Sequence, residues 1–557
     1  ICAEPGVGKS RLVTRFLYAV NPTQFQVLTT ACDSHNRSTA YLPFSNLIRC
    51  WLNVQDSDSQ LDIAQKLRDR VANLSAGFAE HLSAYHFLLD LPIQNQSWNN
   101  LEPVQKRQRA RKALRALLEE LAGIKPMVIL LEDLHWIDGE SQTLLEQLVK
   151  SVHEHAIMLI VTYRPEYQAS WLNDNVSLLE VKPFTDMESN DYLKGVLGKD
   201  SSLTTLRDEI SRRCEGNPLY IEEMIHHLMD SNLIWGEPGH YTSGLNNLPE
   251  TLPLTIHSVI STRIDRRSKL AKNILQAASA IGQRFSTGLL DYITDIPRDY
   301  AKHAIDELVQ CGLVIKTTEG ISDEYQFKHA LVHQVTYDSI PRERKRLIHA
   351  SLVNAIESLH KERLEEHVYR LAEHAYVGQY WHKAVEYYLK ACYHAIGRSS
   401  HHQAVLLLDR GLEALRHLPL NKDTLGQRID FLAVGMNALI PLGEQDRLVR
   451  DLKEAEKLCD AVGEPKRTCS ILCQLTNALW MVGKHSEAFS ASSRAVELAR
   501  EIEHAPLQIA ANYNLAMVYH AMGDFDNCIR LEQSILKVLS GDMEVSRLGW
   551  SGYPSVF

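Results

Sequence analysis

In the first 185 residues, short apolar runs alternate with longer stretches in which apolar residues recur every three or four positions. The short runs predict strands, and there are four of them: Phe25–Thr30, Met127–Leu131, Met158–Thr162 and Leu178–Val181. The longer stretches predict helices, for example Glu102–Leu121 and Ser141–Val152. Because strands that alternate with helices usually pair in parallel, we expect a parallel sheet with helices on both faces.

After Phe184 the helical period dominates, and Asp186–Ile234 predicts helices interrupted by a turn at Glu215–Pro218. Three further helices are predicted, at Leu254–Asp265, Leu270–Ile281 and Tyr300–Cys311. Two short strand-like runs come next, Leu313–Thr317 and Glu324–Lys328. Helices followed by a small hairpin favour a winged-helix-like unit in this part of the chain.

An internal repeat occupies the region that is nearly all helix-forming from about Arg346 onward. Gly443, Gly483 and Gly523 are 40 residues apart (483 − 443 and 523 − 483), and each follows an apolar helical stretch. Ala455 and Ala495 recur in phase, where small side chains let two helices approach. This pattern favours helix-pair repeats close to tetratricopeptide units over the alternative of an irregular helical domain.

The composition of the chain argues against one class of function, nucleic-acid binding. The chain has 557 residues, with 59 basic and 69 acidic side chains and a net charge of −10. An acidic balance argues against binding nucleic acid mainly through phosphate contacts. The basic run Arg342–Arg346 is a local candidate, and a solvated helix start is the favoured alternative.

The chain gives no sign of a membrane span, because its longest apolar runs, Met127–Leu131 and Ala156–Val161, have the length of buried strands. Its ten cysteines are scattered without a C-x-x-C pair, which predicts a reducing, cytoplasmic location. The histidines lack the spacing of a metal site. The chain opens on Ile1 with a motif in its first ten residues, so we expect a fragment of a longer protein.

That first motif is Ala3-Glu4-Pro5-Gly6-Val7-Gly8-Lys9-Ser10, which matches the phosphate-binding loop G-x-x-x-x-G-K-[ST] except that Ala3 replaces the first glycine. Gly6 and Gly8 let the backbone turn its amides toward phosphate oxygens. Lys9 can neutralise the β- and γ-phosphates, and the Ser10 hydroxyl can coordinate Mg²⁺. The helix that starts near Lys9 directs its positive end toward the same anion.

Two further signals follow predicted strands. Glu132 and Asp133 come directly after Met127–Leu131, where carboxylates can hold Mg²⁺ and activate water. Arg164 follows the next strand, where it can sense a γ-phosphate, and a surface arginine is an equal alternative. Each signal is weak alone, but together with the phosphate loop they favour an ATPase.

Several segments in order along the chain resemble the STAND-class signal-transduction ATPases. The segments are LEDLHWID (131–138), VTYRPEY (161–167), CEGNPLYIEEM (214–224), ILQAASAIGQRF (274–285) and YQFKHALVHQVTYDSI (325–340). More narrowly, they resemble the AAA-like ATPase modules with tetratricopeptide-like repeats that lie behind bacterial class III adenylate/guanylate cyclase domains and in large LuxR-type regulators.

The resemblance implies a role for each matching residue. ATP would be bound by Glu4, Pro5, Gly6, Val7, Gly8, Lys9, Ser10, Arg11 and Pro218. Mg²⁺ would be held by Ser10 with Glu132 and Asp133, and Glu132, Asp133 and Arg164 would be catalytic. Relatives often carry Asp-Asp where this chain has Glu132-Asp133, so we assign that pair jointly. His329 matches a winged-helix histidine that contacts nucleotide, and a core histidine is an equal alternative.

Together these features predict an α/β P-loop NTPase domain followed by a helical solenoid. We expect the NTPase domain at residues 1–185, a helical lid at 186–250, a winged-helix-like domain at 251–345 and tetratricopeptide-like repeats at 346–557. The domain order favours a switch that binds and slowly hydrolyses ATP. The alternatives are a LuxR-type transcription regulator whose helix-turn-helix lies outside this chain, and a nucleotide-bound scaffold that does not hydrolyse ATP.

The predicted partners follow from the same resemblance. They are ATP or ADP, a protein or small-molecule effector on the repeats, and a fused output domain that this chain lacks, with a cyclase favoured. We expect no direct contact with nucleic acid or membrane, and self-association that depends on nucleotide.

Overall fold

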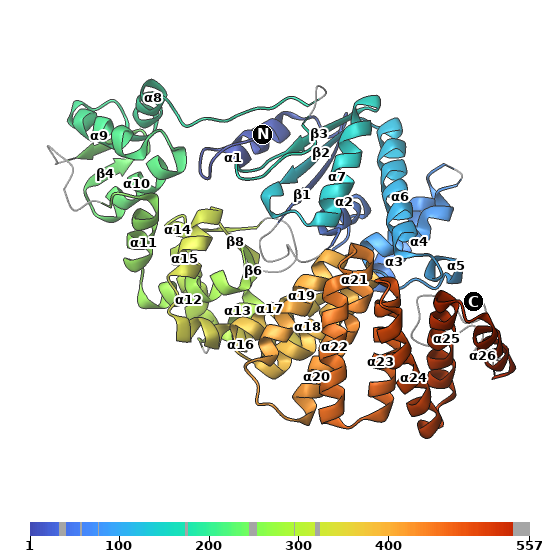
Figure 1. Ribbon diagram of the computed structural model, residues 1–557. Helices are drawn as coiled ribbons and strands as arrows, with labels where there is room; N and C mark the ends of the chain where they lie inside the picture. The colour runs from blue at the N-terminus through green and yellow to red at the C-terminus, as the bar shows by residue number, and fades with distance from the viewer. Residues whose placement is uncertain are drawn as a thin grey trace. The chain divides into compact units, whose positions relative to one another are not determined.

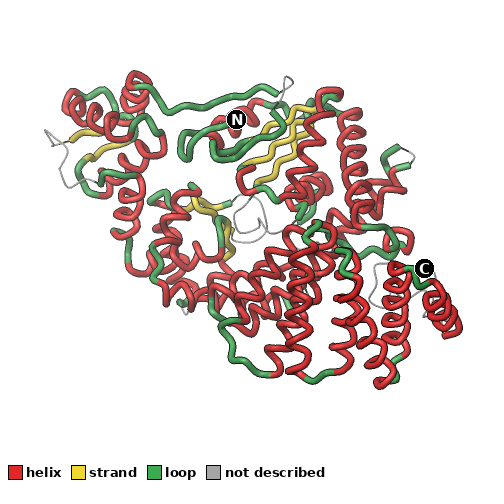
Figure 2. Tube along the Cα trace, in the orientation of Figure 1, coloured by secondary structure: helices red, strands yellow, loops and turns green. Residues whose placement is uncertain are grey.

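The computed structural model describes residues 1–538 except 33–39, 56–57, 76, 173–175, 244–252, 295, 318–323 and 362. The chain divides into two compact units, the first built from residues 1–370 and 377–379 and the second from 371–376 and 380–557. Strands occur only in the first unit among the described residues, and the second is helical (Figure 2). Within the described ranges, no helix is both long enough and apolar enough to span a membrane.

The first unit contains the predicted parallel sheet. Its three strands are β1 (Gln26–Ala31), β2 (Met127–Glu132) and β3 (Ile157–Val161), in the order β1-β2-β3 (Figure 1). Val128 pairs with Val27 on one side and with Met158 on the other, and both pairings are parallel. Of the predicted strand Leu178–Val181, only Glu180 forms a β-bridge, and it pairs with Cys2.

The first residues of the chain extend this sheet beyond β3. Cys2 forms parallel bridges to both Tyr163 and Glu180, so it lies between these two segments. The Cys2 amide donates to the Leu179 carbonyl at 2.9 Å, and the Ala3 amide donates to the Tyr163 carbonyl at 3.3 Å. Because parallel strands end at the same edge, the segment after Ala3 begins where β2 and β3 end.

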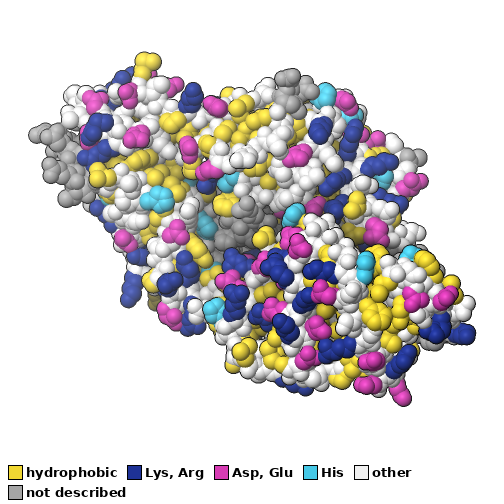
Figure 3. All heavy atoms as spheres, in the orientation of Figure 1, with side chains coloured by type: hydrophobic (Ala, Val, Ile, Leu, Met, Phe, Trp, Pro, Cys, Tyr) yellow, Lys and Arg dark blue, Asp and Glu magenta, His cyan; other side chains and the backbone are white. Residues whose placement is uncertain are grey.

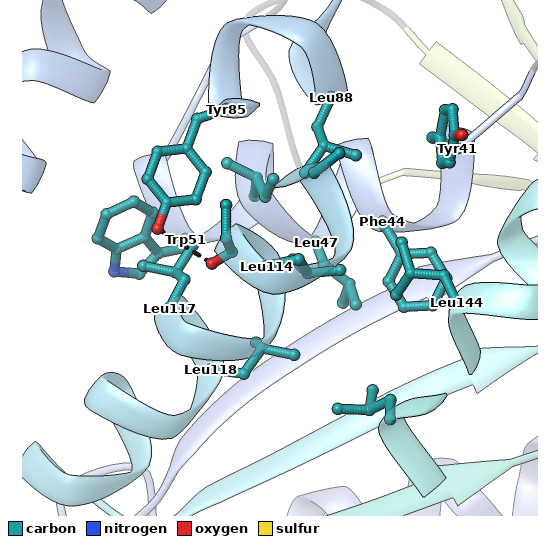
Figure 4. Close-up of a cluster of buried hydrophobic side chains, with 14 of the residues drawn as sticks. Tyr41, Phe44, Leu47, Trp51, Tyr85, Leu88, Leu114, Leu117, Leu118 and Leu144 are labelled. Carbon is teal, nitrogen blue, oxygen red and sulfur yellow. Dashed lines mark hydrogen bonds between the residues drawn. The ribbon is translucent and has the colours of Figure 1, made fainter. Parts of the chain in front are cut away.

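Helices surround this sheet and form its hydrophobic core. They are α1 (Lys9–Ala19), α2 (Leu42–Leu52), α3 (Gln60–Ala72), α4 (Leu82–Leu89), α5 (Gln96–Asn99), α6 (Pro103–Ile124) and α7 (Gly139–Ser151). Phe44, Leu114 and Leu144 come from three different helices and are buried in one cluster (Figure 4). In the same cluster the Tyr85 hydroxyl donates to the Ala113 carbonyl at 3.1 Å, so its polar end is satisfied.

The chain continues with three helices and a hairpin, in the region predicted as a lid. These elements are α8 (Asp186–Leu197), α9 (Thr204–Cys214), α10 (Pro218–Asp230), β4 (Ile234–Glu237) and β5 (His240–Ser243). The predicted turn at Glu215–Pro218 is present, because Glu215 and Gly216 both adopt positive φ angles between α9 and α10. The hairpin was not predicted, since its four-residue strands include Gly236 and lack a clear apolar alternation.

Helices and a small antiparallel sheet follow, as the sequence predicted. They are α11 (Ile256–Asp265), α12 (Lys269–Ile281), β6 (Arg284–Ser286), α13 (Thr287–Ile293), α14 (Arg298–Gln310), β7 (Val314–Lys316), β8 (Glu324–Phe327), α15 (Ala330–Asp338) and α16 (Arg342–Leu359). The sheet has the order β6-β8-β7, so the predicted hairpin of β7 and β8 is joined by a third strand that the sequence did not reveal.

A buried ion pair joins the lid region to this second group of helices. Arg263 of α11 is only 1% exposed, and its guanidinium donates to the equally buried Glu223 of α10 and to the Cys311 carbonyl, the latter at 2.6 Å. Asp230 at the end of α10 accepts from Arg263 at 3.4 Å. Removing one partner of such a pair leaves the other charge buried without a counter-ion, which typically lowers the free energy of unfolding by about 3–5 kcal/mol.

The basic run at the start of α16 packs against neighbouring elements. Arg344 donates to the Asn273 side chain of α12 at 2.8 Å, and the Lys345 ammonium lies 3.8 Å from the centre of the Tyr337 ring. Arg346 pairs with Glu343 on its own helix. Three of the basic side chains therefore already have partners within the protein.

The second unit is a series of paired helices. After α17 (Val368–Val377), they are α18 (Trp381–Gly397), α19 (His401–Leu415), α20 (Lys422–Val434), α21 (Met436–Leu442), α22 (Gln445–Val462), α23 (Pro465–Met481), α24 (His485–Ile502), α25 (Ala505–Met522) and α26 (Phe525–Val538). Gly443, Gly483 and Gly523 all have φ between 73° and 81° and end the first helix of a pair. These angles confirm the predicted role of the repeated glycines.

The surface of this second unit carries both signs of charge. Figure 3 shows basic and acidic side chains intermixed over the helical repeats. Several form ion pairs between different helices, for example Arg447 of α22 with Asp409 of α19 and Arg494 of α24 with Asp460 of α22. Ala455 and Ala495, the small residues predicted to lie between helices, are fully buried.

The core around the sheet provides a first test of the structure. Leu114→Ala should destabilise the part of the chain around the parallel sheet by about 2–5 kcal/mol, because the substitution leaves a cavity beneath α6. The identical substitution at Leu61, whose side chain is 79% exposed on α3, should change stability by less than about 0.5 kcal/mol. Urea unfolding followed by circular dichroism would measure both, and equal effects would contradict the placement of Leu114 in the core.

Candidate functional site

The loop between Ala3 and α1 has the backbone geometry of an anion cradle. Gly6 and Gly8 have φ angles of 82° and 110°, a region that glycine adopts at little cost. Gly8 occupies the N-cap position of α1 and has no side chain that could cap it. Within the described part of the chain, the amides of Gly6, Val7 and Gly8 donate no hydrogen bond. Free amides beside a helix N-terminus are the usual composition of a phosphate-binding loop.

Lys9 is held inside this loop and is only 9% exposed. Its ammonium donates to the carbonyls of Ala3 and Glu4, at 2.5 Å and 3.1 Å. Burial lowers the pKa of Lys9, Asp133 opposes that shift, and Arg164 adds to it. The charges of Asp133 and Arg164 therefore both act on Lys9, as expected if the three residues share one site.

The Ser10 hydroxyl links the loop to the end of β2, because it donates to a carboxylate oxygen of Glu132 at 3.0 Å. Burial raises the pKa of Glu132, and the hydrogen bond from Ser10 partly offsets the rise. The charge of Arg284, the first residue of β6, also favours the ionised form. Ser10 and Glu132, two of the three residues predicted to hold the metal, are thus in contact although 122 positions separate them.

Asp133, the other acidic residue, has an unusual backbone conformation, and hydrogen bonds to the residue after β3 fix it. Its φ angle is 57°, in the left-handed region. Its amide donates to the Thr162 hydroxyl at 3.0 Å, and the next amide, of Leu134, donates to the Thr162 carbonyl at 2.9 Å. The Asp133 carboxylate is 41% exposed, so water can reach it from solvent.

The remaining predicted residues differ in how close they come to this cluster. Arg164 is half-buried just after β3, its carbonyl accepts from the Tyr167 amide at 3.0 Å, and its charge acts on Lys9. The side chains of Glu4 and Arg11 are exposed, and Arg11 points with Thr14 and Arg15 toward an open depression beside α1. Of these three, only Arg164 is a part of the charged cluster around Lys9.

Pro218 lies next to the phosphate loop, because it is the first residue of α10 and that helix begins on the loop. The Asn217 side chain donates to the Pro5 carbonyl at 3.1 Å, and the Leu219 amide donates to the Gly6 carbonyl at 3.2 Å. Gly216 is fixed just before the helix, where a β-carbon would lie 2.0 Å from the Phe184 carbonyl. No larger residue fits at Gly216 without moving the Phe184 backbone.

His329 lies against the lid helix rather than against the phosphate loop. Its Nε2 atom is 3.8 Å from a carboxylate oxygen of Glu222, the same side chain that binds the Lys328 ammonium at 2.5 Å. Burial lowers the pKa of His329. In this structure His329 therefore contacts α10 one turn beyond Pro218.

The residues present fit MgATP. Amides and a lysine ammonium suit phosphate oxygens, while the Ser10 hydroxyl and the Glu132 carboxylate are the hard oxygen ligands that Mg²⁺ prefers. No group of three or more acidic, histidine or cysteine side chains could hold a metal in the described part of the chain. Mg²⁺ is usually bound by one or two protein oxygens together with substrate phosphates and water.

Sequence reasoning missed two residues of this site. Asn217 could have been found, because asparagine before a helix-starting proline is a typical N-cap and its side chain accepts from the Tyr220 amide. Thr162 gave no signal, since a threonine at the end of a buried strand is common. Its contact with Asp133 depends on the pairing of β2 with β3.

The buried carboxylate predicts a pH-dependent effect on stability. Folding raises the pKa of Glu132 above its ordinary value of 4.5, so the ionised form costs stability, and this cost appears as pH rises through the raised pKa. Glu132→Gln should therefore raise the unfolding temperature of the ligand-free chain by about 1–3 °C at about pH 7.5. The gain should shrink toward about pH 5. Differential scanning fluorimetry would measure both, and a variant less stable than wild type at the higher pH would contradict the argument.

Comparisons with known proteins give matches to two parts of the chain. Residues 1–161 match the family model of the AAA ATPase domain, and residues 186–241 match a domain of unknown function (DUF8739). An uncharacterized protein of Rhizobium meliloti (strain 1021) is 24% identical over 425 residues, which are 74% of this chain and 40% of that protein. The chain thus spans less than half the length of this curated relative.

Two solved structures are similar to this chain at low identity. A STAND protein with a tetratricopeptide repeat sensor from Pyrococcus horikoshii is 13% identical, with 96% of this chain and 77% of that chain covered and a TM-score of 0.35. A kinesin light chain-like protein of Podospora anserina with tetratricopeptide-like repeats is 16% identical, with 35% and 95% covered and a TM-score of 0.27.

The AAA family match includes the phosphate loop, the first two strands of the sheet, both acidic residues and β3. It bears out the AAA-like ATPase part of the resemblance seen in the sequence. Over residues 1–161 this chain is similar to the AAA ATPase domain family.

Proposed function

We propose that this chain is a signalling switch of the STAND type that binds and hydrolyses MgATP. The observation that carries the proposal is the contact between Ser10 of the phosphate loop and Glu132 at the end of β2, beside the buried Lys9 ammonium. The phosphate loop thus carries a hydroxyl bonded to a carboxylate and, at the adjacent residue, a buried ammonium. This is the set of groups that phosphoryl transfer requires.

Each side chain has a task in this proposal. Lys9 neutralises the β- and γ-phosphates, and the amides of Gly6, Val7 and Gly8 bind their oxygens. Ser10 and Glu132 hold Mg²⁺, which when bound neutralises charge that develops on the phosphates. Asp133 accepts a proton from the attacking water, since its exposed carboxylate lies in the same cluster as Lys9. Arg164 stabilises negative charge on the γ-phosphate.

Regulation is assigned to the helical repeats. We propose that they bind a protein or small-molecule effector and that slow hydrolysis resets the switch. Helix-pair repeats offer extended surfaces for partners, and the mixed charges on this unit favour recognition by shape and paired polar groups over a field of one sign. The output domain that we propose is a class III cyclase, on the strength of the sequence resemblance.

Nucleotide binding is the most direct test. Lys9→Ala should weaken MgATP binding at least about tenfold, or about 1.4 kcal/mol, because the phosphate charge loses its buried counter-ion. Arg15→Ala is the matched control, since it also removes a cation from α1, but at an exposed position away from the loop. Isothermal titration calorimetry on the whole chain would compare them. Unchanged affinity in Lys9→Ala would refute the assignment of the phosphate loop.

Hydrolysis tests the acidic pair separately. Asp133→Asn should lower ATP turnover by about 100-fold while MgATP affinity changes little, because asparagine keeps the size but cannot take the proton from water. Glu132→Gln should mainly weaken the dependence of binding on Mg²⁺. A coupled phosphate-release assay with purified whole chain would measure turnover. If neither substitution slows turnover of a protein that binds ATP, the pair has no catalytic role.

A further inference from the structure

The lid helix α10 contacts the phosphate loop through two consecutive carbonyl groups. The Asn217 side chain donates to the Pro5 carbonyl at 3.1 Å, and the Leu219 amide donates to the Gly6 carbonyl at 3.2 Å. The approach is close, because a β-carbon on Gly6 would lie 2.8 Å from the Asn217 side-chain oxygen and 2.9 Å from Leu219 Cβ. Only glycine permits this contact at Gly6, where φ is also 82°.

These two bonds fix the direction of two amides. In a planar trans peptide the C=O and the following N–H point in opposite directions. The Pro5 carbonyl shares its peptide plane with the Gly6 amide, and the Gly6 carbonyl shares its plane with the Val7 amide. Because both carbonyls point at α10, both amides point away from the lid, and neither donates a hydrogen bond among the described residues.

Unpaired amides in a partly buried loop point to a ligand. Val7 is buried and Gly6 is half-buried, and buried amides in proteins are nearly always paired. Two free donors held side by side by carbonyl contacts on their far side form an anion-binding concavity. Helix α10 therefore fixes the orientation of these two amides without contacting the anion itself.

We propose that Asn217 is a positioning residue for phosphate: its side-chain amide locks the Pro5 carbonyl outward, so that the Gly6 and Val7 amides are preorganised for the phosphate oxygens. The inference rests on the proposed function and adds a regulatory consequence. Any movement of α10 away from the loop releases both carbonyls and lowers the affinity for the phosphate part of the nucleotide. The coupling acts on phosphate and not on the adenine base.

Asn217 has a second task, and the experiment must separate the two. Its side-chain oxygen accepts from the Tyr220 amide at 3.2 Å and so caps α10. Serine is an equally good N-cap and is uncharged, but it lacks the amide that reaches the Pro5 carbonyl. Asn217→Ser thus keeps the cap and removes the loop bond, whereas Asn217→Ala removes both.

The test measures binding of tripolyphosphate and of MgATP to the whole chain by calorimetry. Asn217→Ser should weaken both about fivefold, the effect of one lost hydrogen bond, while the unfolding temperature stays within about 1 °C of wild type. Asn217→Ala should lose affinity and thermal stability together. Asn421→Ser is the matched control, because Asn421 caps α20 in the helical repeats, and it should bind both probes like wild type.

The outcomes distinguish this inference from the proposed function. If wild type binds neither probe, the proposed function is wrong and the inference falls with it. If wild type binds and Asn217→Ser binds both probes equally well, the proposed function stands and the role of Asn217 is refuted. Loss of MgATP affinity without loss of tripolyphosphate affinity would also overturn the inference, since the side chain would then act through the base.

Discussion

The ammonium of Lys9 is a buried positive charge whose direct hydrogen bonds go to carbonyl oxygens of its own loop. Carbonyl dipoles solvate such a charge only in part, and burial accordingly lowers the pKa of Lys9. The surrounding structure limits the cost, because β2 and β3 end beside the loop and bring the charge of Asp133 near the ammonium. A bound polyanion would neutralise the Lys9 charge much more completely. The neighbouring Arg164 strengthens that preference, since two cations held together favour an anion between them.

Much of this arrangement could be predicted from sequence, because it depends on local patterns. The alternation of apolar runs gave β1, β2 and β3 to within one residue at each end, and parallel pairing then places Glu132 and Arg164 at the same edge as Lys9. The repeated glycines predicted where helices end in the second unit, since a left-handed residue after a helix is a local requirement. The assignment of site roles remains a prediction.

The features that could not be predicted from the sequence depend on contacts between distant segments. The hydrogen bond that the Asp133 amide donates to Thr162 requires the register of two strands, and the one that Asn217 donates to the Pro5 carbonyl joins residues 212 positions apart. The expected strand at Leu178–Val181 is reduced to a bridge between Glu180 and Cys2, a pairing of residues 178 positions apart. His329 illustrates the same limit, since the motif gave its type but not that it faces Glu222.

These distant contacts converge on one helix. Helix α10 holds the phosphate loop at its first turn, meets Lys328 through Glu222 near its middle, and pairs with Arg263 through Glu223 and Asp230. Its 13 residues span about 20 Å. The buried Arg263–Glu223 pair resists separation, because each isolated charge would lack a partner in the interior. The neutral bonds to Pro5 and Gly6 are weaker, so when strain reaches α10 these loop contacts yield before the ion pair does.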